Sequence, residues 1–484
     1  MNAIIKTFNT MIKEKNIALF LISLISLASF HFQISAQNLK VSDNNRFLVH
    51  EDNSPFFYLG DTAWELFIRL NKKETEFYLR NRAGKDFNVI QCVLTGTGMS
   101  DLEKPTKEGN TVFIDMDPTK PNDKHFDHVD WVIDKADELG MYLAMLPVWA
   151  TLVVDENPVL DKTSAYSYGL YLGNRYKNKT NLIWVLGGDK RAEGYEQVWE
   201  NLAKGIKDGG SNHLMTYHYH LYDEQVSSDV WQSAKWLSFN MVESGHMSAF
   251  DDNYRLITED YNKIPIKPVL DGELMYEGIL IGFCSTNGKA NTHMVRVETY
   301  WSVFAGAFGF TYGQNSVWQF YNNEKKWSWG ADISWKEGME APGSFQMQFL
   351  KNLMLSRPYL SRIPDQSIIE PKASHGVDHI QATRDGTLGG NDATYIMVYF
   401  PFLTHKYKIH TDAISASKLR IWWFDPRTGE FFDKGEIENT GIFELPWGSE
   451  ISTNNTGPDW VLVIDDGAKK YPPPEESLSH ILSK

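Results

Sequence analysis

Eight short apolar segments recur along the first two thirds of the chain, and they constrain its fold more than any other feature. They lie at 56–64, 87–94, 141–150, 181–189, 213–220, 236–246, 267–277 and 308–313. Amphipathic segments of helical period separate several of them, at 73–86, 127–140, 195–210 and 294–307. This alternation predicts an α/β protein, and eight such strands predict a (β/α)8 TIM barrel. An open doubly wound sheet is the alternative, but the first segment runs into GDTAWEL rather than a Gly-rich phosphate turn.

From about Ser367 the apolar pattern changes to a period of two. HIQATRD, TYIMVYFPF, KLRIWWF, FELPW and DWVLVIDD are separated by Gly, Asn, Asp and Pro, with no helical segment between them. This pattern predicts that the barrel is followed by a C-terminal antiparallel β-sandwich domain. We expect the sandwich to pack against the barrel first and to bind glycans second.

The N-terminus predicts export. A lysine-containing stretch, MNAIIKTFNTMIKEK, precedes the apolar run NIALFLISLISLASF and the small residues of HFQISAQ. This order is typical of a secretory signal peptide cleaved near Ala36. A retained membrane anchor is the alternative, but the run is short for a span. We expect a secreted chain, located in the periplasm or at the cell surface, with no membrane span after processing.

The domain boundaries follow from these patterns. The predicted parts are a signal peptide at 1–36, the barrel at 37–365, the sandwich at 366–470 and a loosely held tail at 471–484.

Composition narrows the partners. The net charge is −15 and no cluster of cations follows the signal peptide, which disfavours nucleic acid as a partner. Aromatic residues make up 13% of the chain, and rings that do not fill the core can cover the apolar faces of sugars, so we expect an oligosaccharide or polysaccharide substrate. Two cysteines, Cys92 and Cys284, cannot build a disulfide framework or a zinc site alone.

Two carboxylates stand where a barrel carries its active site, at the C-terminal ends of strands. Asp189 ends the fourth predicted strand in NLIWVLGGDK, and Glu273 ends the seventh in VLDGE. Such a pair can cleave a glycosidic bond, with Asp189 as acid/base and Glu273 as nucleophile. The structural alternative for either residue is a helix cap or an ion pair. Asp271 is the rival within the second motif, on the same side of the strand but deeper in the barrel.

Other strand ends carry polar and aromatic side chains suited to binding sugar hydroxyls and rings. For each of them, packing is the alternative to substrate contact. The predicted substrate-binding residues are Asp61, Trp64, Gln91, Trp149, His218, His220, His246, Tyr312, Gln314 and Trp318.

The histidines raise the question of a metal. His218 and His220 fall on one face of a strand, and with His246 they allow metal-dependent hydrolysis as a weaker hypothesis. Metal-dependent amidohydrolase barrels carry their His-x-His at the end of strand one, where this chain has Asp61 and Thr62. We therefore expect no metal and no other cofactor. Acyl transfer is disfavoured because there is no G-x-S-x-G elbow.

The motifs also resemble those of a known family. GDTAWEL, LIWVLGGDK, YHYH, ESGH, LDGELMYEG and FAGAFGFTYGQNSVW are similar to motifs of the apiosidase-like glycoside hydrolases, glycoside hydrolase family 140, and IWWFDPRTGEF resembles the sandwich domain that follows the family's barrel. The resemblance implies a retaining hydrolase of pectic side chains that acts at apiose in rhamnogalacturonan II. It places the family's acid/base on Asp189 and its nucleophile on Glu273. A non-catalytic glycan- or protein-binding protein is the alternative function.

Overall fold

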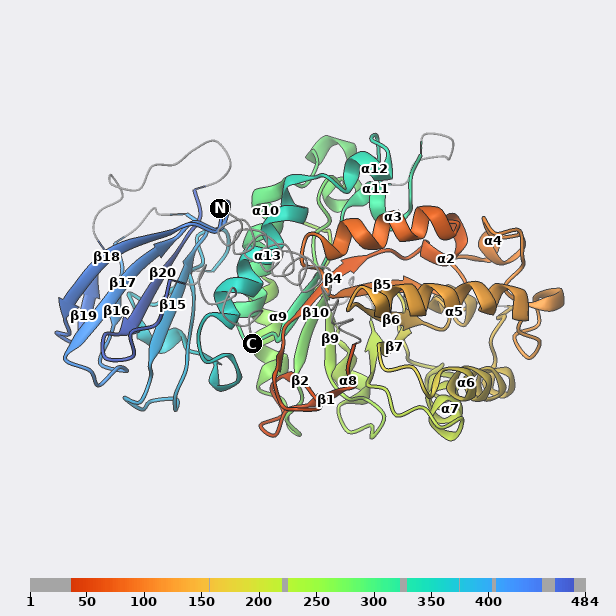
Figure 1. Ribbon diagram of the computed structural model, residues 1–484, viewed down its shortest axis with the longest axis horizontal. Helices are drawn as coiled ribbons and strands as arrows, with labels where there is room; N and C mark the ends of the chain where they lie inside the picture. The colour runs from red at the N-terminus through yellow and green to blue at the C-terminus, as the bar shows by residue number, and fades with distance from the viewer. Residues whose placement is uncertain are drawn as a thin grey trace, which may run out of the picture. The chain divides into compact units, whose positions relative to one another are not determined.

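The computed structural model describes residues 36–155, 157–219, 225–322, 329–373, 375–402, 406–445 and 458–473 (Figure 1). The predicted signal peptide lies outside the described residues apart from Ala36, and so does most of the predicted tail. None of the helices in the described ranges is long and apolar enough to cross a membrane.

The eight predicted strands form one parallel sheet, in the spatial order β8-β7-β6-β5-β4-β11-β10-β9. The predicted TIM-like fold is therefore confirmed. Hydrogen bonds also join the end strands β8 and β9, since Ser238 N donates to the Met215 carbonyl at 2.7 Å and Thr216 Oγ1 donates to the Phe239 carbonyl at 2.7 Å. The strands are β4 Tyr58–Thr62, β5 Val89–Val93, β6 Tyr142–Leu146, β7 Leu182–Gly187, β8 Met215–His218, β9 Asn240–Glu243, β10 Val269–Glu273 and β11 Gly309–Tyr312.

The first predicted strand is divided in the structure. Its initial residues belong to a small antiparallel sheet of β1 Leu39–Val41, β2 Leu48–His50 and β3 Pro55–Phe56, and only Tyr58–Thr62 enters the barrel.

The four predicted amphipathic segments are helices α3, α5, α7 and α10. Helix α3 begins at a capping box in which Asn71 accepts from Glu74 N at 3.0 Å. Gly173 of α6 approaches α7 so closely that a Cβ would lie 2.1 Å from the Ile206 carbonyl oxygen, so these helices can pack only without a side chain there. The helices of at least eight residues are α3 Lys72–Ala83, α5 Asp123–Glu138, α6 Lys162–Tyr176, α7 Glu196–Asp208, α9 Asn253–Tyr261, α10 Thr292–Phe304 and α13 Pro342–Leu355.

Shorter helices fill the loops between these elements. The α-helical turns are α2 Leu66–Arg69, α4 Met99–Leu102, α8 Ser227–Trp231, α11 Asn315–Trp318 and α12 Trp335–Gly338. The 3-10 turns are η1 Ile114–Met116, η2 Ala150–Leu152, η4 Ile281–Phe283, η5 Ser285–Asn287, η6 Tyr359–Ser361 and η7 Gln366–Ile368.

Two antiparallel sheets follow the barrel, as the sequence predicts, and their larger strands lie side by side in blue in Figure 1. The six-stranded sheet has the order β12-β14-β15-β20-β17-β18, with β12 Ile363–Pro364, β14 Gln381–Arg384, β15 Tyr395–Phe400, β20 Trp460–Asp466, β17 Lys418–Phe424 and β18 Phe431–Glu438. The three-stranded sheet has the order β13-β16-β19, with β13 Ile369–Glu370, β16 Lys408–His410 and β19 Ile442–Glu444.

The strand β15 shows why the larger sheet is apolar on both faces, because successive side chains of a strand point to opposite sides. Its even-numbered residues pack in the sandwich core, namely Ile396, Val398 and Phe400. Its odd-numbered residues belong to the core cluster of the barrel, namely Tyr395, Met397 and Tyr399. The sheet therefore buries one face within the sandwich and the other against the barrel.

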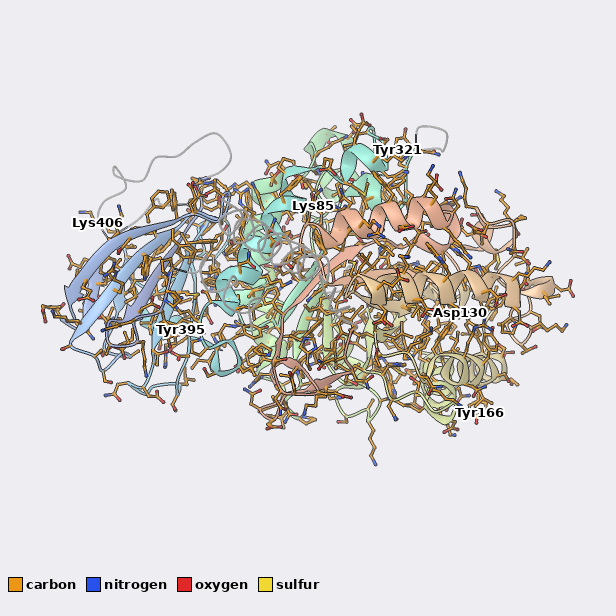
Figure 2. The ribbon with its side chains drawn as sticks, viewed as in Figure 1. Lys85, Asp130, Tyr166, Tyr321, Tyr395 and Lys406 are labelled. Atoms are coloured by element: carbon orange, nitrogen blue, oxygen red, sulfur yellow. The ribbon has the colours of Figure 1, made fainter. Side chains whose placement is uncertain are left out.

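Buried polar contacts join the same surfaces. Arg296 of α10 forms a two-pronged ion pair with Asp459, at 2.9 and 2.7 Å, and both side chains are fully buried. The Tyr395 hydroxyl, labelled in Figure 2, donates to the Pro358 carbonyl at 3.3 Å. These contacts support the expectation that the sandwich is a packing partner of the barrel.

The Arg296–Asp459 pair yields a stability prediction. Asp459→Ala leaves the guanidinium buried without its carboxylate, so we expect the free energy of unfolding to fall by about 3–5 kcal/mol. Glu259→Ala removes an exposed i,i+4 partner of Arg255, and it should change the free energy of unfolding by less than about 1 kcal/mol. Urea denaturation of both variants checks this, and equal destabilisation by the two would show that the buried pair has no special weight.

Candidate active site

A cavity of about 370 Å³ opens among the loops that follow the barrel strands, and both predicted catalytic carboxylates line it. This volume is within the range of small-molecule sites. The lining residues are Trp64, Thr97, Trp149, Asp189, Lys190, Glu243, His246, Glu273, Tyr276, Ile279, Phe283, Trp318 and Trp329.

Two glycines place Asp189 in this cavity. Gly187, Gly188 and Asp189 have φ of 89°, 117° and 49°, a run of left-handed backbone that turns the chain sharply at the end of β7. A Cβ on Gly187 would lie 2.2 Å from the His218 carbonyl oxygen, and one on Gly188 would lie 2.6 Å from the Trp149 ring. Only glycine fits either position, so the GGD sequence is required by the backbone.

Glu273 is held by two imidazoles. Its Oε2 atom accepts a hydrogen bond from His218 Nε2 at 2.8 Å, and its Oε1 atom accepts one from His246 Nε2 at 3.2 Å. Burial alone would raise the pKa of this carboxyl, but the hydrogen bonds and charge of the two histidines outweigh burial and lower the pKa to about 2. Glu273 is therefore ionised near neutral pH.

The pKa of Asp189 is shifted in the opposite direction to that of Glu273. Its side chain is 45% exposed because one edge faces the cavity, whereas Oδ1 is buried without a hydrogen-bond partner among the described residues. Desolvation of this group, followed by the negative charge of Glu273, raises its pKa to about 7, against the opposing charges of His218 and Lys190. A substantial fraction of Asp189 thus carries a proton at neutral pH.

His218 lies between the two carboxylates. Its Nδ1 is 3.1 Å from the Tyr219 carbonyl and its Nε2 is 2.8 Å from Glu273, and both neighbours are acceptors, so both ring nitrogens donate. Burial would lower the pKa of this histidine, but the bond to Glu273 and the nearby carboxylates raise it. Asp189 Oδ1 lies 3.7 Å from the same Nδ1 atom, so His218 stands between the two carboxylates.

The same protons bear on the metal hypothesis. Asp189, His218 and Glu243 offer atoms within 4.8 Å of one another, which is close enough to share a cation. A metal ligand needs a free imidazole lone pair, and both nitrogens of His218 direct protons at oxygen atoms. His246 contacts Glu273 through Nε2 while its Nδ1 has no hydrogen-bond partner among the described residues, and His220 lies outside those residues. With both nitrogens donating, His218 offers no lone pair to a cation shared with Asp189 and Glu243.

Aromatic rings form the walls beside the carboxylates. The predicted residues Trp64 and Trp149 pack edge to face, with centroids 5.0 Å apart, and each also contacts the His218 ring. Trp64 Nε1 donates to the Tyr276 hydroxyl at 2.9 Å, which fixes the indole. Trp318 also lines the cavity, so the structure brings three predicted tryptophans together with Asp189 and Glu273.

Four other predicted binding residues lie away from the cavity lining. Gln91 donates from Nε2 to the Gly272 carbonyl at 2.9 Å inside the barrel. Asp61 is fully buried and pairs with Arg82 of α3 at 2.7 Å. The last two hold loops: the Tyr312 hydroxyl donates to Glu277 at 2.6 Å, and Gln314 caps α11.

Asp271 differs from the sequence prediction, which placed it on the same side of the strand as Glu273. A β-bulge between Asp271 and Glu273 shifts the register of β10 against β9 and reverses the alternation. Asp271 therefore contacts Ser244 at 3.0 Å, together with Asn253 and Ser302 of the covering helices. Asp271 is not a rival to Glu273 in the cavity.

Sequence reasoning did not select Glu243, Tyr276, Phe283 and Trp329 as site residues. Glu243 is the last residue of β9. A carboxylate at a strand end is the same feature that identified Asp189 and Glu273, so the sequence could have indicated Glu243 as well. Tyr276 stands three residues after Glu273, where its hydroxyl lies near the carboxylate: burial, then the charge of Glu273, raises the pKa of this tyrosine. Phe283 and Trp329 lie on loops, and no periodic pattern marks them.

Comparisons with known proteins agree with this geometry. A sequence profile described as "Apiosidase-like, catalytic domain" matches residues 42–361, about two thirds of the chain. The chain belongs to the apiosidase-like family. A second profile, described as "Putative collagen-binding domain of a collagenase", matches residues 363–465 of this apiosidase-like protein. A search among curated protein sequences gave no significant match.

Two solved structures are similar to this apiosidase-like chain over nearly its whole length. One, described as a glycoside hydrolase, is 34% identical with a TM-score of 0.82, and the match covers 90% of this chain and 98% of that one. Another, described as a glycoside hydrolase family 5 protein from Bacteroides vulgatus ATCC 8482, is 32% identical with a TM-score of 0.83, covering 91% and 98%. The protein thus has a glycoside hydrolase-like TIM barrel.

Proposed function

We propose that this apiosidase-like protein is a retaining glycoside hydrolase in which Asp189 is the acid/base and Glu273 the nucleophile. The observation that carries the proposal is geometric: both carboxylates line one cavity, and they lie on either side of His218, with Glu273 Oε2 2.8 Å from Nε2 and Asp189 Oδ1 3.7 Å from Nδ1. The environments of the two carboxyls also separate their pKa values, to about 7 for Asp189 and about 2 for Glu273. The group with the higher pKa suits the acid, and the group with the lower pKa suits the nucleophile.

In the first step, Glu273 attacks the anomeric carbon while Asp189 gives its proton to the departing glycosidic oxygen. The electron pair of the broken C–O bond stays on that oxygen, and a covalent glycosyl-enzyme forms on Glu273. In the second step, Asp189, now a carboxylate, takes a proton from water. The water oxygen attacks the anomeric carbon and frees Glu273, so two displacements retain the anomeric configuration.

For the substrate we propose plant cell-wall glycans, specifically pectic side chains that carry apiose in rhamnogalacturonan II. The family membership supports this choice, and the aromatic walls of the cavity suit sugar rings. The test is incubation of wild type, Asp189→Asn and Glu273→Gln with oligosaccharides from rhamnogalacturonan II and other wall polymers, followed by chromatography of the products. New reducing ends should appear with the wild type alone. Binding without cleavage of any glycan would favour a non-catalytic binding protein.

We also propose that the protein is exported and that its signal peptide is cleaved near Ala36, which leaves it in the periplasm or at the cell surface. The order of charged, apolar and small residues before Ala36 supports this. N-terminal sequencing of the protein recovered from fractionated cells tests the proposal, and an intact Met1 would contradict it.

The charge of Lys190 yields a prediction on pH dependence. The basic limb of kcat/KM should follow ionisation of Asp189, with a pKa of about 7, because the proton donor is lost above it. The positive charge of Lys190 favours ionised Asp189, so Lys190→Met should move this limb to higher pH. Lys204→Met, which removes an exposed partner of Asp208, is the control and should leave the limb in place. A shift to lower pH in the Lys190 variant would contradict the assignment.

A further inference from the structure

The indole of Trp329 is held at the mouth of the cavity with much of its surface in water. Its exposed fraction is 47%, and it is the only exposed tryptophan in the described part of the chain. The rings on the cavity floor are different, since Trp64 and Trp149 are buried at 3% and 5%. A large apolar surface that lines a cavity and stays exposed indicates a place for a ligand.

The backbone beneath this ring is held in an unfavourable conformation. Trp329 has φ of 55°, in the left-handed region that bulky side chains rarely adopt. Its carbonyl oxygen accepts hydrogen bonds from Leu280 N at 3.1 Å and from Asn315 Nδ2 at 2.9 Å, and these bonds fix the residue. Strain of this kind persists where the surroundings enforce it and is concentrated at functional sites.

A second aromatic residue, Phe283, also lines the cavity and also has a left-handed backbone. Phe283 lines the same cavity with φ of 57°, and its ring packs against Trp329 with centroids 4.6 Å apart at an angle of 52°. On its other side Phe283 meets the His246 ring edge to face at 5.9 Å, and His246 holds Glu273. Three rings thus lead from the mouth of the cavity to the nucleophile.

We propose that Trp329 and Phe283 form a binding subsite for a second sugar of the substrate, beside the sugar whose bond is cleaved. The proposal rests on the proposed function and adds which residues hold the sugar next to the cleaved bond. A sugar ring has an apolar C–H face that an indole covers, while its hydroxyls stay in water at the open side of the subsite. The packing of Trp329 on Phe283 means that the platform exists before the ligand binds, which lowers the entropic cost of binding.

Binding to an inactive enzyme tests this subsite apart from turnover. Oligosaccharides of two to four sugars from pectic and other wall glycans, and their constituent monosaccharides, are titrated calorimetrically into Glu273→Gln. The same titrations use Glu273→Gln with Trp329→Ala. The oligosaccharide that binds most tightly should lose about 10- to 100-fold in affinity, the scale for one buried aromatic contact. The monosaccharides should lose much less, and Trp329→Phe should restore most of the affinity.

Phe77→Ala in the same background is the matched control, because Phe77 is 51% exposed on α3 and does not line the cavity. Its titrations should match those of Glu273→Gln alone. Equal affinities with and without Trp329, or no oligosaccharide that binds more tightly than its monosaccharides, would overturn the subsite. Failure of the proposed function looks different: the wild type releases no product from a glycan that still binds through Trp329.

Discussion

Glu273→Gln should lower kcat by about 10⁴-fold or more, the scale expected when a covalent nucleophile is removed. An amide cannot form the glycosyl-enzyme, whatever the leaving group of the substrate, so natural glycans and activated glycosides should be affected alike. Initial rates on both kinds of substrate check this. Added azide should restore part of the rate by attacking the anomeric carbon directly, and the glycosyl azide should have inverted configuration.

The matched control is Glu277→Gln, which alters another buried carboxylate four residues further along. Glu277 accepts hydrogen bonds from Tyr312 at 2.6 Å and from Gly343 N at 3.0 Å, outside the cavity lining. Folded Glu277→Gln enzyme should turn over at nearly the wild-type rate. Turnover by Glu273→Gln within tenfold of the wild type would remove Glu273 from the mechanism.

Asp189→Asn should have the second largest effect, and the effect should depend on the leaving group. On natural glycans the loss should be about 10²- to 10⁴-fold, because a sugar alkoxide leaves poorly without a proton donor. A glycosyl fluoride needs no proton to depart, so its first step should be slowed far less. Hydrolysis of the intermediate still needs the base, so kcat falls while KM falls with it.

Comparing kcat/KM for a natural oligosaccharide and a glycosyl fluoride measures this dependence. The basic limb of the pH profile should also disappear with the fluoride and Asp189→Asn, since the group that titrates with a pKa of about 7 is gone. An equal loss of kcat/KM on both substrates would show that Asp189 is not the proton donor.

The fold was predictable from the sequence because its eight strands are separate in sequence and strongly apolar. The positions of Asp189 and Glu273 follow from strand order alone, since strand ends in a barrel face one mouth. The outward direction of Asp271 was not predictable. One extra residue, Gly272, forms a bulge that puts Asp271 and Glu273 on opposite faces of the strand, and this bulge leaves no mark in the apolar pattern.

For the remaining site residues, the role depends on which side chains or backbone groups they contact in the fold. Asp61 looks like a site residue until Arg82 is seen 2.7 Å away, and Arg82 lies in a helix that sequence alone does not orient. The loop residues Trp329 and Phe283 carry no periodicity, and their place in the cavity depends on backbone contacts such as Leu280 N to the Trp329 carbonyl. Period and strand order predict the scaffold, whereas side-chain pairing depends on how helices and loops are arranged in three dimensions.

Trapping the covalent intermediate tests the central claim most directly. Asp189→Asn is mixed with the glycosyl fluoride of the sugar that the wild type releases, quenched in acid, weighed as an intact protein by mass spectrometry and digested to locate the label. The two-step mechanism predicts a mass increase of one glycosyl residue, on the peptide that carries Glu273. A label on Glu243 or Asp271, or release of fluoride with no labelled protein at any time, would contradict it.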